Sequence, residues 1–418
     1  MKLDGVFMSA SYGPYNPRPN TGFANVESQV RSFWRRVSNG LEIHQLWEQF
    51  KADARAGYGW YSKEIGWEPI PGEPRWKQYW RIARAVFWAM VMKLSPARRV
   101  LLIIALALVV LGIFGSEIQV SDRTVISVGG GYAILGALAL LLLLALELAD
   151  RVTMKRDLEI AKEIQHWLVP EKPPVIPGVE IAFASRAANT VAGDYYDAFL
   201  RPGPSALSEG STADSSSAGD SRRLLLVVAD VAGKSVPAAL LMATFQASLR
   251  TLALEPSLLP DLTAGLNAYA CEISQTGRRF TTAFLAELDL ATHKLTYVNA
   301  GHNRPMLVRS SGSGRGFVQV ERLEEGGLPL GIVRNVGYQS GETTLAAGDR
   351  LVIFTDGAVE AENAVADEFG EGRLLGELQA GRGSRAADAL KSLMTSIDAF
   401  VGQAPQHDDI TCLILDCL

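Results

Sequence analysis

The sequence predicts an α+β fold, in which two packed antiparallel sheets flanked by helices follow a helical transmembrane hairpin and a linker helix. Two observations lead to this prediction. From residue 178 onward, short β-branched runs and helical stretches follow one another without the strict alternation that a parallel sheet requires. Before them stand two long apolar runs without charged residues, as paired membrane spans have.

Length and composition set broad limits on the protein. The chain has 418 residues, enough for two or three domains. Its net charge of −5 argues against nucleic acid as the main partner. The cysteines Cys271, Cys412 and Cys417 form no even set and are typical of a reducing compartment.

The N-terminal residues divide into two predicted regions. Residues 1–24 lack a periodic apolar pattern and the apolar core of a signal peptide, so we expect them to be disordered. Residues 25–97 are expected to form a helical juxtamembrane region. Within it, Arg75–Leu94 alternates tryptophan with lysine and arginine, which a membrane interface favours. The alternative is a helix packed on a neighbouring domain.

Residues 98–149 are predicted to form a two-helix transmembrane hairpin. Its apolar runs are Val100–Gly115 and Val125–Leu146. A span needs about 20 residues, so the second run suffices and the first is supported as half of a hairpin. Basic residues flank the pair, which predicts that both ends are cytoplasmic: Arg98, Arg99, Arg151, Lys155 and Arg156. We expect a multi-pass protein in the cell inner membrane, in contact with membrane lipid; the alternative is a buried hairpin of a soluble domain.

Residues 150–170 are predicted to form a linker helix, which Pro170 ends. One stripe of this helix is apolar and permits pairing with a second copy, although Gln165 interrupts it: Met154, Leu158, Ala161, Ile164 and Leu168. A homodimer through this helix is therefore one expectation. The helix would either transmit a signal to the domain that follows or serve only as a tether.

The domain at residues 171–418 is expected to contain short strands and several helices. The expected strands are Val179–Ser185, Tyr195–Leu200, Leu224–Ala229, Thr281–Leu288, Lys294–Asn299, Met306–Arg309 and Leu351–Phe354. The expected helices are Pro237–Leu254, Pro260–Gln275 and Ala386–Phe400. Residues 201–223 are rich in Ser, Gly, Ala and Pro, so we expect a disordered loop there.

The run Leu224–Ala229 is apolar throughout, as a strand buried on both faces is. It ends on Asp230, a turn follows at Gly233, and Pro237 opens a helix. An acidic side chain is thus placed at the rim of a sheet. A phosphate-binding P-loop is excluded, because its pattern requires glycine where Val228 stands.

Three further acidic sites stand at turn-like positions, namely Asp194, Asp356 and the pair Asp408–Asp409. Strand-like runs precede Asp356 and follow Asp409. Carboxylates at strand ends can converge on a hard cation such as Mg²⁺ or Mn²⁺. No Cys/His pair has zinc spacing.

Six motifs stand in order from Ala192 to the C-terminus: Ala192–Asp197 (AGDYYD), Val228–Ala243 (VADVAGKSVPAALLMA), Phe280–Phe284, Asn299–Asn303, Thr355–Gly357 and Asp408–Thr411 (DDIT). With these motifs, the chain from about residue 158 resembles the metal-dependent protein phosphatases (the PPM or protein phosphatase 2C superfamily). Within that superfamily it resembles the bacterial branch of stage II sporulation protein E and RsbU. The resemblance implies an αββα sandwich. It also implies a serine/threonine phosphatase whose substrate is a signalling phosphoprotein, such as an anti-anti-sigma factor.

The resemblance also implies a metal site. Asp230 would bridge two divalent cations, Mn²⁺ or Mg²⁺, with the Val231 carbonyl as a further ligand. Asp356 and Asp408 would complete one shell, and Asp194 would bind directly or through water. The cations would activate the attacking water. Asp409 is the residue most easily confused with Asp408.

Two positions depart from the family pattern. Ala192 and Ser235 each stand where glycine is usual, which would change the backbone near the metals without removing a carboxylate. Asp197 and His302 are expected to be structural, and Lys234 to be solvated or to face phosphate. The alternative function is a catalytically weak scaffold or receptor with the phosphatase fold. The retained aspartates favour the enzyme over the scaffold, and the apolar runs favour its anchoring in the membrane.

Overall fold

The computed structural model describes scattered positions between residues 74 and 92 and then residues 94–418, except 115–116, 122–123, 204–221, 275–278, 311–318 and 382. Side chains of residues 117–129 are not described. The expected disordered start, most of the juxtamembrane region and the centre of the 201–223 tract therefore lie outside the described residues. The chain divides into two compact units, residues 1–147 and 148–418.

The first unit contains helix α4 (Pro96–Phe114), a small β-hairpin and the start of helix α5 (Val128–Leu168). The hairpin pairs β1 (Glu117–Ser121) with β2 (Thr124–Ser127) in antiparallel register. The apolar run that begins at Val125 therefore starts in a strand, and its helix begins at Val128. The β-branched residues Thr124, Val125 and Ile126 favour a strand, and the helix begins only after them.

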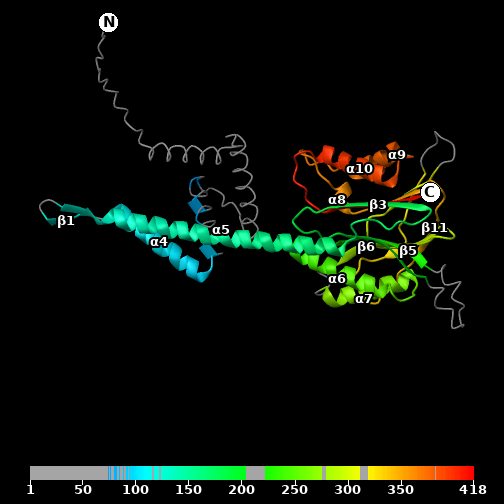
Figure 1. Cartoon of the computed structure of the whole chain (residues 1–418), viewed down its shortest axis with the longest axis horizontal. Coiled ribbons are helices and arrows are strands. Elements are labelled where there is room, and N and C mark those ends of the chain that lie inside the picture. Colours follow the sequence, from blue (N-terminus) through cyan, green and yellow to red (C-terminus); the bar gives the residue numbers. More distant parts are fainter. Residues whose placement is uncertain are drawn as a thin grey trace, which may run out of the picture. The chain divides into compact units, whose positions relative to one another are not determined.

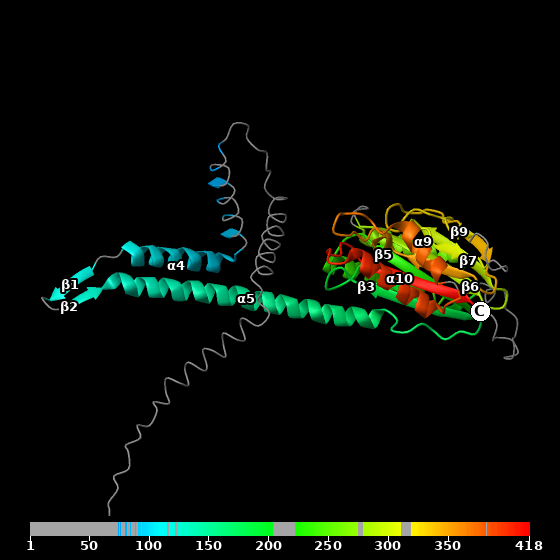
Figure 2. The same cartoon turned by 90° about the horizontal axis from the view of Figure 1, so that it is seen from above.

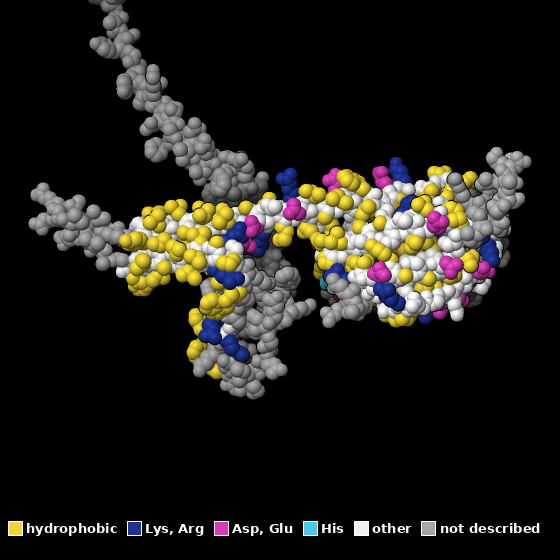
Figure 3. Space-filling view, turned by 90° about the horizontal axis from the view of Figure 1, so that it is seen from below, with side chains coloured by type: hydrophobic (Ala, Val, Ile, Leu, Met, Phe, Trp, Pro, Cys, Tyr) yellow, Lys and Arg dark blue, Asp and Glu magenta, His cyan; other side chains and the backbone are white. Residues whose placement is uncertain are grey.

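Helices α4 and α5 carry apolar surfaces. Both have an 18-residue window of mean hydropathy 2.4 and are long and apolar enough to cross a membrane. Figure 3 shows hydrophobic side chains covering this part of the chain. The two helices pack closely, since a β-carbon on Gly112 would meet the Ala133 backbone nitrogen at 2.5 Å and one on Gly136 would meet Val109 at 2.7 Å. The second apolar run and the linker belong to one helix of 41 residues.

Two β-sheets form the centre of the second unit. The six-stranded sheet contains β4 (Tyr195–Pro202), β5 (Arg222–Val231), β6 (Thr281–Asp289), β7 (Lys294–Ala300), β10 (Gly326–Gly327) and β11 (Gly341–Thr344). The five-stranded sheet contains β3 (Val179–Arg186), β13 (Ile410–Cys417), β12 (Arg350–Phe354), β8 (Met306–Val308) and β9 (Val320–Arg322). Every pairing in the two sheets is antiparallel except that of β10 with β7.

Helices cover the outer face of each sheet (Figures 1 and 2). Helices α6 (Val236–Leu252) and α7 (Leu259–Ile273) share an apolar core with the six-stranded sheet. Helices α8 (Asp356–Val359), α9 (Gly370–Ala380) and α10 (Ala386–Val401) share one with the five-stranded sheet. A third core lies between the sheets and contains residues of both. The predicted αββα sandwich is confirmed.

The predicted strands and helices of this unit are present, with ends that differ from the prediction by up to two residues. The sequence pattern missed β9, β10 and β11, which have two to four residues each and little apolar content. It also missed helices α8 and α9. It also placed Arg201 and Arg223 in a loop, whereas both lie in strands. Both arginines can lie at the ends of strands because Glu287 on β6 forms an ion pair with each of them.

Arg201 and Glu287 form an ion pair inside the protein, with 2.7 Å between Nη1 and Oε1. The two residues are 1% and 2% exposed. The Arg201 guanidinium also donates to the Ser257 carbonyl at 2.9 Å. Burial of two charges is tolerated only when both are paired and hydrogen-bonded, as here.

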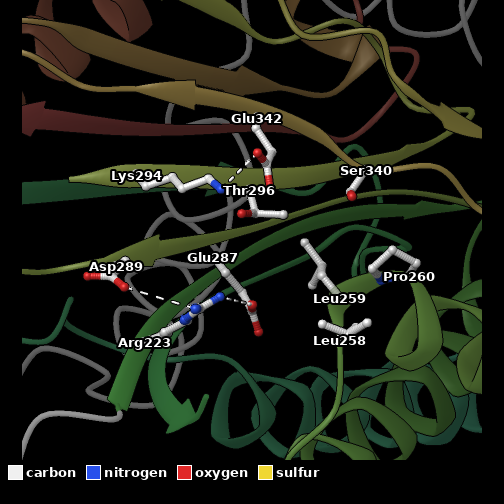
Figure 4. Close-up of a pocket in the computed structure, with 10 residues that line it drawn as sticks. All are labelled: Arg223, Leu258, Leu259, Pro260, Glu287, Asp289, Lys294, Thr296, Ser340 and Glu342. Atoms are coloured by element: carbon white, nitrogen blue, oxygen red, sulfur yellow. Dashed lines mark ion pairs between the residues drawn. The ribbon is translucent and has the colours of Figure 1, made fainter. Parts of the chain in front are cut away.

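Glu287 also lines a pocket of about 250 Å³, in which Arg223 points toward Glu287 and Asp289 while Lys294 pairs with Glu342 (Figure 4). This pocket lies toward the start of β5 and the end of β6, since Leu224 pairs with Leu288 there. Asp230 stands near the other end of β5. The pocket is therefore separate from the predicted metal site.

We expect Glu287→Ala to lower the free energy of unfolding by about 3–5 kcal/mol, because it leaves the Arg201 charge buried without its partner. Glu342→Ala is the matched control in the same pocket. It breaks an exposed ion pair with Lys294, worth less than about 1 kcal/mol. Proteolysis in increasing urea measures both values. Equal losses in the two variants would contradict this account of the buried pair.

Candidate functional site

Asp230 stands near the end of a strand whose centre is completely buried. Residues 224–229 of β5 are fully buried, and Asp230 pairs with Thr282 on β6. The turn after it is fixed by the Ala232 N–H, which donates to the Phe280 carbonyl at 2.9 Å. Burial, together with the charges of Asp356 and Asp408, raises the pKa of Asp230 to about 7.

Asp194 stands in the irregular segment before β4 and is 4% exposed. The Thr355 hydroxyl donates to its Oδ2 at 3.0 Å. Burial first, and then the charge of Asp230, raises the pKa of Asp194 well above its ordinary value. The structure therefore brings Asp194 and Asp230 into electrostatic contact, as the predicted site requires.

Asp356 and Asp408 come from the other sheet. Asp356 begins α8 directly after β12, and Asp408 precedes β13, the antiparallel partner of β12. Burial and the neighbouring Asp408 raise the pKa of Asp356. The two turns approach so closely that a β-carbon on Gly357 would lie 2.1 Å from the Asp409 carbonyl oxygen. Only glycine permits this approach.

Asp408 and Asp409 have different surroundings. Asp409 accepts the Ala188 N–H at 2.7 Å and the Gly193 N–H at 2.5 Å, so both of its oxygens hold the segment before Asp194. Asp408 is partly exposed, and its Oδ2 lies 3.1 Å from the Lys234 ammonium. The Asp409 carboxylate therefore holds the backbone before Asp194 by hydrogen bonds, whereas the Asp408 carboxylate faces the acidic cluster.

Four carboxyl groups, those of Asp194, Asp230, Asp356 and Asp408, therefore gather where the ends of the two sheets meet. Among the described residues, no three acidic, histidine or cysteine side chains already surround one point closely enough to hold an ion. Burial, and then the charges of the neighbouring carboxylates, raise the pKa values of Asp194, Asp230 and Asp356, and a bound divalent cation would offset both effects. Oxygen donors of this kind fit Mg²⁺ or Mn²⁺.

Val231 presents its backbone to the same cluster. A β-carbon on Gly193 would lie 3.2 Å from the Val231 carbonyl oxygen, so this oxygen adjoins the segment that carries Asp194. The residues predicted as metal ligands from the sequence thus lie around one place in the fold. Their role as ligands remains a prediction.

The turn after Asp230 contains backbone strain. Gly233 has φ +123°, which glycine adopts freely. Ser235 has φ +64° and ψ −148°, a conformation that residues with a β-carbon rarely adopt. This position is one of the two at which the sequence departs from the family's glycine. Lys234, between them, donates to the His407 carbonyl at 2.5 Å.

Two other polar residues have internal partners. Asp197 is buried, forms an ion pair with Arg250 and accepts the Ala198 N–H at 2.8 Å. His302 is buried, and its Nδ1 lies 3.1 Å from the Thr282 hydroxyl. Burial lowers the pKa of His302 to about 4, so the ring is neutral near pH 7. Both arrangements are those of structural residues, as the sequence predicted.

The comparison with known proteins identifies the domain. Residues 220–418 match the family Stage II sporulation protein E (SpoIIE). The chain is 27% identical over 270 residues to "Phosphoserine phosphatase RsbU" of Bacillus subtilis, which covers 63% of this chain and 70% of that protein. It is 24% identical over 277 residues to "Phosphoserine phosphatase RsbP" of the same organism, with 63% and 58% covered. The chain thus spans less than two thirds of RsbP.

The fold is also found among solved structures. The SiaA-PP2C domain of Pseudomonas aeruginosa aligns with a TM-score of 0.50 at 19% identity, over 64% of this chain and 98% of that domain. This likeness shows the fold. With the family match, it leads to one conclusion: the C-terminal domain of this chain belongs to the stage II sporulation protein E family of PP2C-type phosphatases.

Proposed function

We propose that this chain is a membrane-anchored, metal-dependent phosphatase that removes phosphate from serine or threonine of a signalling protein. One observation supports this above all: carboxyl groups from both sheets meet at one partly buried site, where burial and neighbouring carboxylates raise the pKa values of Asp230 and Asp356. The relatives RsbU and RsbP, named as phosphoserine phosphatases, support the same reaction. A small phosphoprotein of the anti-anti-sigma type is the substrate class that the family resemblance favours.

Asp194, Asp230, Asp356, Asp408 and the Val231 carbonyl are the groups that would hold two divalent cations, Mn²⁺ or Mg²⁺. Bound cations would supply positive charge to the phosphoryl oxygens and lower the pKa of a water molecule. Asp194 would be oriented by its hydrogen bond from Thr355. In the reaction, a water oxygen bonds to phosphorus, the bond to the seryl oxygen breaks, and that oxygen takes up a proton.

Lys234 is placed to help the substrate bind. Its side chain is 54% exposed and stands beside Asp408 at the edge of the cluster. A flexible ammonium group at this edge can meet an incoming phosphate dianion. No general base from the protein is required, and the neutral His302 is enclosed behind Thr282.

Residues 98–149 would anchor the protein in the cell inner membrane. The exposed apolar side chains of α4 and α5 and the close glycine contacts between the helices support a transmembrane hairpin. By the positive-inside rule, the flanking arginines support a topology in which both ends, and with them the phosphatase domain at 171–418, would be cytoplasmic. The linker helix at 150–170 would join anchor and domain and would be the site of any homodimer contact.

We expect Asp230→Asn and Asp356→Asn each to reduce turnover of a chromogenic phosphoester at least about 100-fold, since residues that only support metal ligands already contribute about 10–100-fold. The fold should persist, because each change relieves like-charge repulsion. A chelator should silence the intact protein, and Mn²⁺ or Mg²⁺ should restore it. Hydrolysis that continues in a chelated, metal-free sample would contradict the mechanism.

Asp408 and Asp409 provide the internal control. Asp408→Asn should raise the Mn²⁺ concentration needed for activity and leave thermal stability unchanged. Asp409→Asn should lower thermal stability, because its amide cannot accept both the Ala188 and Gly193 N–H groups. Inactivity of the intact protein with every metal and phosphoprotein tried would instead support a scaffold with the phosphatase fold.

The topology is tested by labelling. In a background without Cys271, Cys412 and Cys417, a cysteine at Gln119 should react with an impermeant thiol reagent in intact cells, because it lies between the two spans. Cysteines at Ser38 and Ser313 should react only after lysis. Labelling of the cysteine at Ser313 in intact cells would contradict a cytoplasmic phosphatase domain. Release of the chain from membranes by alkaline carbonate would contradict the transmembrane anchor.

A further inference from the structure

Helix α5 reaches the phosphatase domain near its C-terminal end. Within residues 157–168, the less exposed positions are Leu158, Ala161, Gln165 and Leu168, at spacings of three and four residues. This is the spacing of a single helix face. The residues between them are exposed. Gln165 is the only residue of this face with a polar side chain, and that side chain reaches the domain.

The Gln165 amide forms two hydrogen bonds with one residue, Ala192. Its Nε2 donates to the Ala192 carbonyl at 2.6 Å, and its Oε1 accepts the Ala192 N–H at 2.9 Å. Two bonds to the donor and the acceptor of one residue fix both the position and the orientation of that stretch of backbone. Ala192 stands two residues before Asp194.

The segment from Ala192 to Asp194 belongs to no helix or strand, so side chains elsewhere must hold it. Asp409 holds Gly193, and Thr355 holds Asp194. Both of these come from the five-stranded sheet side of the domain. The third, Gln165, comes from the helix that continues from the apolar segment.

An open groove lies beside this contact. It has a volume of about 660 Å³, separates α5 from the β3–β4 segment, and has Lys162, His166, Arg186 and Asp194 among its lining residues. Val169, just after the helix, packs against the apolar core that α6 and α7 share with the six-stranded sheet, and this contact helps to hold the end of α5. The two Gln165–Ala192 hydrogen bonds add the contact that acts directly on the backbone before Asp194.

We infer that Gln165 is a positioning residue for the metal site: it holds Ala192, and through it Asp194, at the place where the Asp194 carboxylate can bind a cation. This inference rests on the proposed phosphatase function. Loss of the amide would let the segment shift while Asp230, Asp356 and Asp408 stay in place. The consequence is weaker metal binding with an intact fold.

The test compares Gln165→Leu, which keeps the size of the side chain but forms neither hydrogen bond, with the unchanged full-length protein in detergent. Direct Mn²⁺ binding is followed by the electron paramagnetic resonance signal of free Mn²⁺, and activity is titrated with Mn²⁺. We expect the dissociation constant and the half-activating Mn²⁺ concentration to rise about 10–100-fold in Gln165→Leu. At saturating Mn²⁺, kcat and KM should return to nearly those of the unchanged protein.

Two further variants separate positioning from folding. Gln165→Glu keeps an acceptor for the Ala192 N–H and loses the donor, so its Mn²⁺ affinity should also fall even if its stability is unchanged. Asp157→Asn, at an exposed position of the same helix, is the matched control and should bind Mn²⁺ normally.

The outcomes are distinct. Normal Mn²⁺ affinity in both Gln165 variants, with or without a lower melting temperature, would overturn the positioning role and leave the proposed function standing. A kcat that stays low at saturating Mn²⁺ would also overturn it, since it would point to a direct part in the reaction or to misfolding. If the unchanged protein neither binds Mn²⁺ nor hydrolyses phosphoesters, the proposed function fails, and the positioning role fails with it.

Discussion

Repulsion between carboxylates is the constraint on which this domain is built. Asp230 stands near the end of a strand of one sheet, and Asp356 and Asp408 stand beside the ends of two strands of the other. Like charges gathered in a partly buried place oppose folding unless something else holds them. Here the packed strands do so, since six successive residues of β5 before Asp230 are fully buried. The apolar packing of the strands thus stabilises the domain against the repulsion between carboxylates at the ends of these strands.

The irregular segments around the site are held by polar contacts instead of apolar packing. Asp409 accepts two backbone N–H groups, Thr355 donates to Asp194, and Gly357 allows two turns to touch. Each contact joins parts of the chain that are distant in sequence. Asp194 has such a partner in Thr355 and also lies against Asp230, whereas both oxygens of Asp409 are taken up by backbone N–H groups. This division explains how neighbours such as Asp408 and Asp409 acquire different surroundings.

The longer strands, the outer helices α6, α7 and α10 and the acidic positions could be predicted from the sequence, because each depends on local pattern. Leu224–Ala229 is uniformly apolar, and the Asp230 turn follows it directly. The contacts that orient the site could not, since Gln165 meets Ala192 across 27 residues and Asp409 meets Ala188 across 221. The local hydrophobic pattern of a sequence does not indicate contacts between residues so far apart in the chain. Strands such as Gly326–Gly327 are too short to leave a pattern, and Thr124–Ser127 was hidden within an apolar run.

Ser235 gives the turn beside Asp230 a particular mechanical character. With φ +64° and ψ −148°, it is in a region that costs a residue with a side chain about 1–3 kcal/mol. Most of the domain lies where its local preferences and its packing agree. At this turn they disagree, and the packing of β5 and α6 on either side imposes the conformation. The β-carbon of Ser235 therefore makes the junction between β5 and α6 a strained segment, whose conformation persists only because both elements are packed.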